Sequence, residues 1–214
     1  MKDTLNFNNS NPAILALSTS DQGLGSLIKL IGSFNLPLRT DFFASLVRAI
    51  IGQQLSVKVA ETIWDRLYKV CEEIKPEVLI SMDDDVLRSV GLSKSKIIYI
   101  KDLSGKVLSK EIDFMEIQSL DDQQIIEVLT SVKGIGRWTA QMFLIFSLGR
   151  PDVFAVDDLG LQRAIKWLYD LEQSPGKAAM KTFGDRWRPY RSTASLYLWE
   201  AINKGYVTKE KPLA

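Results

Sequence analysis

Apolar residues recur along most of the chain at the three- and four-residue spacing of amphipathic helices. Residues 40–51 carry a broad apolar stripe that stops at Gly52, and Ser93-Lys-Ser-Lys96 is expected to open another helix that runs to about Leu108. No segment alternates polar and apolar residues over a length useful for a strand. The pattern therefore predicts an all-α fold. The expected helices cover residues 10–31 (as one or two helices), 40–51, a segment from about 56 onward, 93–108, 159–171 and 189–204.

Capping residues and prolines predict several helix boundaries. Ser81 and Ser119 each stand three residues before an aspartate, a pattern that favours the start of a helix. Ser174-Pro175 is expected to begin another helix. The helix from about residue 56 is expected to bury Val59, Ala60, Ile63, Leu67 and Val70.

Composition limits the chemistry that is available. The 214 residues are 46% hydrophobic with a formal net charge of +1, so any contact with nucleic acid depends on local patches. Cys71 is the only cysteine and there is no histidine. This excludes a disulfide framework, a cysteine-bound iron–sulfur cluster and histidine-based catalysis. With neither a signal-peptide pattern nor an 18-residue apolar run, we expect a cytoplasmic, nucleoid-associated protein that does not contact a membrane.

The segment Gly134-Ile-Gly136 lies between two stretches with helical periodicity. Two glycines at this spacing allow a sharp reversal with positive φ and bring bare backbone N–H groups to the surface. The following helix would direct its unpaired N–H groups and its positive dipole end the same way, which suits a phosphate. By itself the pattern fits an ordinary corner between two helices equally well.

Three blocks together carry a family resemblance. They are Arg48-Ala-Ile-Ile-Gly-Gln-Gln-Leu-Ser56, Gly134-Ile-Gly-Arg-Trp-Thr-Ala140, and Arg186-Trp-Arg-Pro-Tyr-Arg-Ser192 running on to Trp199. The chain resembles the helix–hairpin–helix, Gly/Pro, Asp superfamily of DNA glycosylases, and within it the short form of the DNA-3-methyladenine glycosylase II family. One local departure is Lys133, where the family usually has proline.

The resemblance implies a two-lobed, all-α helix–hairpin–helix glycosylase fold with its active site in the cleft between the lobes. One lobe would hold residues 40–149, and the other would combine residues 1–39 with residues 150–214. We expect the N-terminal β domain of longer family members to be absent. The implied activity is base-excision repair, in which the N-glycosidic bond of alkylated purines such as 3-methyladenine is hydrolysed in double-stranded DNA after base flipping.

Asp158 is the candidate catalytic residue. An aspartate that opens a helix is often only its N-cap, although the helix dipole there also favours a charged carboxylate. An anion about 4 Å from the oxocarbenium charge of a reacting sugar contributes roughly 4 kcal/mol at an effective dielectric near 20. The resemblance selects Asp158 over Asp157, which is expected to be structural, capping or solvated.

The resemblance places Trp138, Trp199 and Met142 at the base pocket, although a tryptophan early in a helix is more often a core residue. Electron-rich rings attract a cationic alkylated purine. Related glycosylase/lyases have their Schiff-base lysine at the position of Trp138, so a monofunctional enzyme with water as the nucleophile is implied. Met142 stands where some relatives have an aromatic residue, and this leaves the substrate range open.

Two loops are expected to contact DNA. Gln54 would fill the gap left by the extruded base, although some relatives have an apolar residue there. The polar break that contains it is equally compatible with glutamines that cap helix ends. The expected DNA-binding residues are Gln53, Gln54, Leu55, Gly134, Gly136, Arg137 and Thr139.

The resemblance also implies a monovalent cation at the hairpin. Its ligands would be the backbone carbonyls of Thr130, Val132 and Gly134, and oxygen ligands without a carboxylate suit Na⁺ or K⁺. No cofactor is expected to be required for the reaction, and we expect a monomer.

Three points stay open at this stage. The basic residues between Lys177 and Arg191 form either a solvated face or part of a mixed cluster, in which Trp187 and Tyr190 pack while some arginines tie one lobe to the other; no phosphate contact is assigned to them. A glycosylase for another purine lesion is an alternative function. A non-catalytic module that binds damaged or unusually structured DNA is a third, and the presence of Asp158 argues against it.

Overall fold

The structure is a computed structural model that describes residues 4–208. The chain divides into two compact units, one made of residues 1–38 with 144–214 and the other of Arg39–Phe143. The sequence had placed the later boundary after residue 149, whereas this division ends the second unit at Phe143, inside helix α9 (Arg137–Phe146). None of the helices in the described part is long and apolar enough to cross a lipid bilayer.

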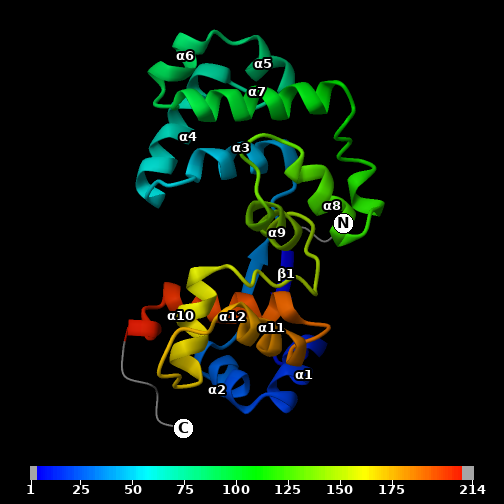
Figure 1. Cartoon of the computed structure of the whole chain (residues 1–214), viewed down its shortest axis with the longest axis vertical. Helices are drawn as coiled ribbons and strands as arrows, with labels where there is room; N and C mark the ends of the chain where they lie inside the picture. Colours follow the sequence, from blue (N-terminus) through cyan, green and yellow to red (C-terminus); the bar gives the residue numbers. More distant parts are fainter. Residues whose placement is uncertain (1–3, 209–214) are drawn as a thin grey trace. The chain divides into compact units, whose positions relative to one another are not determined.

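The regular elements of the second unit are all helices. Helix α7 (Lys94–Leu108) packs against three other helices, α3, α5 and α6 (Figure 1). Its buried residues Ile97, Ile100 and Leu103 follow one another at helical spacing, and its bounds agree with the helix predicted over residues 93–108. The other elements are α3 (Phe42–Gly52), α4 (Val57–Cys71), α5 (Pro76–Ser81), α6 (Asp84–Ser89), a 3₁₀ turn (Ile117–Ser119), α8 (Asp122–Thr130) and the larger part of α9.

The first unit is built around helix α12 (Arg191–Asn203). Every residue from Ser192 to Leu198 is buried, because α12 contacts α1 (Pro12–Ser20), α2 (Gln22–Ile31) and α10 (Leu159–Leu168). Helix α11 (Lys177–Arg186) and a 3₁₀ turn (Tyr206–Thr208) complete this unit. The N-terminal and C-terminal segments of the chain thus share one core.

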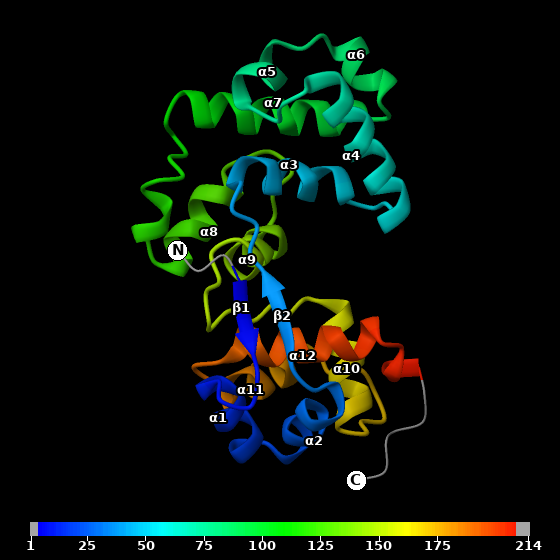
Figure 2. The same ribbon diagram turned by 180° about the vertical axis from the view of Figure 1, so that it is seen from behind.

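The first unit also contains a small sheet that the sequence did not predict. Strand β1 (Thr4–Phe7) pairs antiparallel with β2 (Phe34–Pro37), and the two strands lie side by side in Figure 2. Four residues are too few to show an alternating pattern. The ring of Phe34 lies 5.0 Å from the rings of both Phe7 and Tyr197, so aromatic packing holds the pair on α12. The prediction of a mainly helical fold is otherwise confirmed.

Two helix starts differ from those expected. Ser81 is the last residue of α5, and the side chain of Asp83 caps α6 instead. Asp121, rather than Ser119, caps α8 and forms a capping box with Gln124. In both cases the aspartate directly before the first helical residue reaches the unpaired backbone N–H groups, whereas the serine lies two residues too early.

The buried face of α4 is narrower than expected. Ile63, Leu67 and Cys71 are buried at one residue per turn, whereas Val59 and Val70 are 45% and 46% exposed. Helix α4 packs mainly against α3, which covers only one stripe of it. Three predicted helix boundaries also differ. Helix α10 ends at Leu168 rather than at residue 171, α11 begins at Lys177 rather than at Ser174-Pro175, and α12 begins at Arg191 rather than at residue 189.

Asp21 joins the two segments of the first unit. Its Oδ1 accepts the N–H of Leu24 at 3.0 Å and so caps α2. Its Oδ2 accepts three donors, the hydroxyl of Tyr169 at 2.8 Å, the guanidinium of Arg186 at 2.9 Å and the indole N–H of Trp187 at 3.1 Å. Burial raises the pKa of the Asp21 carboxyl, but these hydrogen bonds and the charge of Arg186 outweigh it and hold the pKa below its ordinary value.

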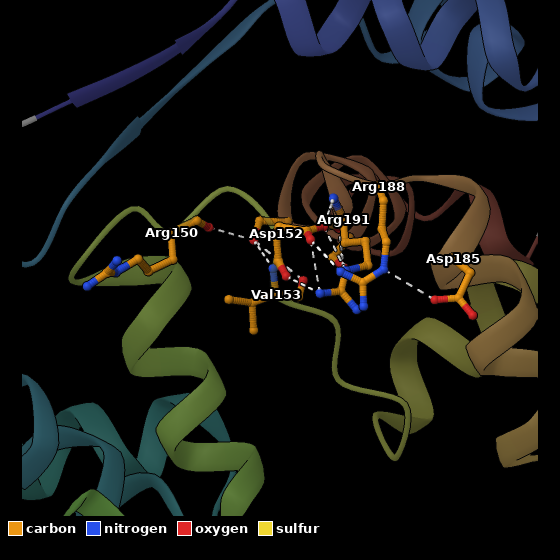
Figure 3. Close-up of polar contacts among 8 residues, drawn as sticks. Arg150, Asp152, Val153, Asp185, Arg188 and Arg191 are labelled. Atoms are coloured by element: carbon orange, nitrogen blue, oxygen red, sulfur yellow. Dashed lines mark hydrogen bonds and ion pairs between the residues drawn. The ribbon is translucent and has the colours of Figure 1, made fainter. Parts of the chain in front are cut away.

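A second carboxylate organises the basic residues near the C-terminus. Asp152 accepts Nη1 of Arg188 at 2.8 Å and Nε of Arg191 at 2.7 Å, and Arg188 also contacts Asp185 (Figure 3). With Arg186 on Asp21 and Lys177 on Asp157, four of the five basic residues between Lys177 and Arg191 pair with carboxylates inside the first unit. The expectation that some arginines tie one lobe to the other is therefore wrong for Arg186, Arg188 and Arg191, whose carboxylate partners all lie in their own unit.

Candidate active site

Asp158 is fixed at the start of α10. It is 8% exposed, and its Oδ1 accepts the N–H of Leu161 at 2.8 Å and the indole N–H of Trp199 at 3.4 Å. Gly160 provides the necessary space, because a Cβ there would lie 2.9 Å from Oδ1. The helix start and Trp199 therefore set the orientation of this carboxylate together.

Asp157 has a different environment although it is the next residue. Its side chain is 53% exposed and lies 2.8 Å from Nζ of Lys177, whose side chain is itself 72% exposed. Such an exposed pair contributes little to stability. Of the two adjacent aspartates, the buried one is thus Asp158, the candidate that the family resemblance selected.

A cavity of about 280 Å³ lies next to Trp199 in the first unit. The ring of Phe146 lies 5.7 Å from that of Trp199 at an interplanar angle of 32°. Glu200 is the one ionisable residue in the cavity wall, and its carboxylate accepts the side-chain amide of Asn203 at 3.2 Å. The remaining lining residues are Phe34, Asn35, Leu36, Leu196, Ile202 and Asn203 itself.

Phe146 and Glu200 were not singled out from the sequence. The signal for Phe146 was its spacing, because Trp138, Met142 and Phe146 follow one another four residues apart on α9 and share one face. Glu200 could have been found only as the neighbour of Trp199.

The predicted pocket residues come from both units. Trp138 and Met142 belong to the second unit, whereas Asp158 and Trp199 belong to the first. Trp138 is 49% exposed and Met142 is half-buried. Contacts within the first unit bring Asp158 and Trp199 together, and a single pocket that also includes Trp138 and Met142 stays a prediction.

The hairpin has the glycine conformation that its sequence predicted. Gly134 has φ of +80°, and a Cβ there would lie 2.1 Å from the ring of Tyr99. A Cβ at Gly136 would meet nothing within 4 Å, so the backbone there is open to an approaching group. The N–H of Ala140 bonds to Gly136 O at 3.1 Å.

The first N–H groups of α9, those of residues 137–139, therefore precede the hydrogen-bonded part of the helix. Arg137 is exposed, whereas Thr139 is 6% exposed. A phosphate contact by Thr139 would therefore depend on its backbone N–H more than on its hydroxyl.

The glutamine loop between α3 and α4 contains one residue in an unusual conformation. Gln54 is exposed and has a backbone φ of +59°, a value that residues other than glycine rarely adopt. Leu55 is 37% exposed. The side-chain amide of Gln53, a residue expected to contact DNA, donates to Gly134 O at 2.7 Å. It thereby ties the loop to the hairpin.

The carbonyls expected to hold a cation fit that role in part. Gly134 O accepts the amide of Gln53, and Val132 O accepts the N–H of Ile135 at 3.1 Å. A carbonyl oxygen has two lone pairs, so each keeps one for an ion. A cation held by Thr130, Val132 and Gly134 is therefore compatible with these bonds and stays a proposal.

Comparisons with known proteins agree on one family. The family model of the HhH-GPD superfamily base excision DNA repair proteins matches residues 47–189. The DNA-3-methyladenine glycosylase 1 of Schizosaccharomyces pombe is 34% identical, over 92% of this chain and 90% of that protein. A crystal structure of a DNA-3-methyladenine glycosidase from Bacillus halodurans superposes with a TM-score of 0.88 at 39% identity, covering 97% of this chain and 96% of that one. The structure of the S. pombe 3-methyladenine DNA glycosylase in complex with abasic DNA superposes with a TM-score of 0.81 at 33% identity, covering 90% of this chain and 97% of that one.

Proposed function

We propose that this chain, which belongs to the HhH-GPD superfamily of base excision DNA repair proteins, is a monofunctional DNA glycosylase that removes alkylated purines from duplex DNA. The observation that carries the proposal is the buried Asp158 carboxylate, held by the start of α10 and by Trp199 beside an aromatic cavity. The names of the relatives support the substrate class.

Alkylation explains why one carboxylate is sufficient. N3- or N7-alkylation makes the purine a cation, so the base becomes neutral when it takes the electron pair of the breaking C1′–N bond. The sugar is left with oxocarbenium charge, and Asp158 stabilises it by roughly 4 kcal/mol at about 4 Å. Water then forms the new C1′–O bond and releases its proton to solvent.

Trp138 supports hydrolysis without strand cleavage. An indole cannot attack the sugar as an amine does, so this position offers no Schiff base. The product would be an intact strand with an abasic site.

The cavity beside Trp199 suits a flat cation. An aromatic face attracts such a base by roughly 0.5–2 kcal/mol. Glu200 adds a negative charge in the same wall. Both features favour a cationic lesion over a neutral one.

The loops of the second unit would hold the distorted duplex. Gln54 would occupy the gap left by the flipped base, with Gln53 and Leu55 supporting the loop. Flipping costs only a few kcal/mol and less at a damaged pair. Gly134, Gly136, Arg137 and Thr139 would contact phosphate through backbone N–H groups and the guanidinium, with a Na⁺ or K⁺ ion adding positive charge. We propose that the protein acts as a monomer in the cytoplasm.

Base release from methylated duplex DNA tests this function. Chromatography of the released bases should detect 3-methyladenine and related alkylpurines, and the strands should break only after alkali. Strand breakage before alkali would contradict the monofunctional assignment. Binding to the duplex without base release would contradict the enzymatic one.

A further inference from the structure

We propose that one face of α7 is a positioning platform that holds both DNA-contacting loops of the second unit in register with each other. The face consists of Lys96, Tyr99 and Asp102, which are spaced three residues apart and lie on one side of the helix. The inference rests on the proposed function, because it assigns these residues a role in how that function uses DNA.

Lys96 holds the end of α3 and the start of the glutamine loop. Its Nζ donates to Ile51 O at 2.8 Å and to Gln53 O at 2.9 Å. Carbonyls at a helix C-terminus lack intrahelical partners, and a cation is favourable there. Burial lowers the pKa of the Lys96 ammonium. The second bond falls on the carbonyl directly before Gln54, so Lys96 fixes the backbone that leads into the strained residue.

Tyr99 and Asp102 hold the hairpin. The ring of Tyr99 lies against Gly134 so closely that no side chain fits between them. Asp102, whose side chain is 19% exposed, accepts the backbone N–H of Lys133 at 2.9 Å. Its other oxygen is 3.7 Å from Nζ of Lys133, whose side chain is 67% exposed. The backbone bond is thus the shorter and less solvated contact of the two.

The two loops are also bound to each other. The side chain of Gln53 donates to Gly134 O at 2.7 Å. The contacts therefore form a closed cycle that begins and ends on α7 and runs through Lys96, Gln53, Gly134 and Tyr99. Loosening any member is expected to shift both loops together and to weaken DNA binding, while the chemical step at Asp158 is left unchanged.

A double-mutant cycle between Asp102 and Lys133 tests the platform directly. Asp102→Ala removes the acceptor and Lys133→Pro removes the N–H donor. Each is expected to weaken affinity for a duplex with a tetrahydrofuran abasic analogue by about tenfold, as expected for a hydrogen bond to a charged group. Because both remove the same bond, the double variant should bind no more weakly than Lys133→Pro alone.

Two variants separate positioning from general stability. Asp102→Asn keeps an oxygen for the Lys133 N–H and should bind within about twofold of wild type, because the exposed ion pair contributes little. Lys101 also lies on α7 but pairs with Asp84 of α6 and with neither loop, so Lys101→Ala should leave binding unchanged. Thermal unfolding of each variant reports its stability. Lys96→Met, which keeps the stem without the donor, provides a second test if Asp102→Ala does not fold.

The outcomes distinguish this inference from the proposed function. The platform predicts a loss of affinity with an unchanged single-turnover rate at saturating DNA. Equal affinities for Asp102→Ala and Lys101→Ala, or independent effects of Asp102 and Lys133, would overturn it. A wild-type protein that releases no base would overturn the proposed function alone, because the affinity cycle is measured without turnover.

Discussion

Replacing Asp21 by asparagine should destabilise the first unit although the two side chains have the same shape. Oδ1 caps α2, while Oδ2 accepts the donors of Tyr169, Arg186 and Trp187. Asparagine has only one oxygen. Whichever way the amide turns, its NH₂ group faces either the Leu24 N–H or three converging donors.

The magnitude follows from the burial of these donors. A buried donor without a partner costs about 1–3 kcal/mol, and the indole of Trp187 is fully buried. The bond from Arg186 contributes at the lower end of its class, because that side chain is 48% exposed. We expect a loss of about 3 kcal/mol, which lowers the Tm of a chain of this size by about 6–12 °C.

Thermal unfolding followed by circular dichroism measures this loss, and Asp41 provides a matched control. Asp41 also caps a helix, through one bond to Ala44 N–H at 2.9 Å, but it is exposed. Asp41→Asn should change Tm by no more than about 2 °C, because asparagine is an equally good N-cap. Equal Tm changes for the two variants would refute the role assigned to Oδ2.

The pH dependence gives a second check on Asp21. Its pKa is lowered in the folded state, so the stabilisation is complete above the ordinary pKa of an aspartate, about 4. It is lost as the pH falls through the lower pKa of the folded protein. The difference in Tm between wild type and Asp21→Asn should therefore be constant near neutral pH and shrink below about pH 4.

Three further substitutions test the loops and the cavity. Gln54→Gly should raise stability by up to about 1 kcal/mol, because it relieves a positive φ, yet weaken affinity for damaged duplex by removing the side chain; unchanged affinity would contradict the role of Gln54. Gly134→Ala should lower both Tm and DNA affinity, because its methyl group would overlap the ring of Tyr99; an unaltered Tm would contradict that packing. Glu200→Gln should reduce the preference for cationic 3-methyladenine over neutral hypoxanthine in competition assays, and an unchanged ratio would exclude a charge effect.

The sequence predicted those parts of the fold that depend on local periodicity. Helix α3 appears where the apolar spacing placed it, and α7 begins directly after its cap Ser93, where the sequence was expected to open a helix. The two strands escaped prediction because contacts between Phe34 and residues far along the chain stabilise them. The same limit hid the hub at Asp21, whose partners on Oδ2 lie 148 to 166 residues away.

The candidate site shows the same division. The helix position of Asp158 and the turn at Gly134 follow from nearby residues, and the structure has both. The supporting contacts of Lys96 and Asp102 do not, because nothing near them in the sequence marks the loops they hold. The bond from the Gln53 side chain to Gly134 O was likewise not predicted, because the two residues are far apart in the sequence.

The most direct test of the account compares Asp158→Asn with Asp157→Asn in single-turnover base release from methylated duplex DNA. Asparagine keeps an oxygen for the Leu161 N–H, so the cap of α10 should survive and only the charge is removed. We predict that Asp158→Asn slows release by about three decades, equivalent to roughly 4 kcal/mol, without weakening DNA binding. The exposed Asp157→Asn should retain the wild-type rate. Normal release by Asp158→Asn, or an equal loss in Asp157→Asn, would contradict the claim that the Asp158 carboxylate stabilises the reacting sugar.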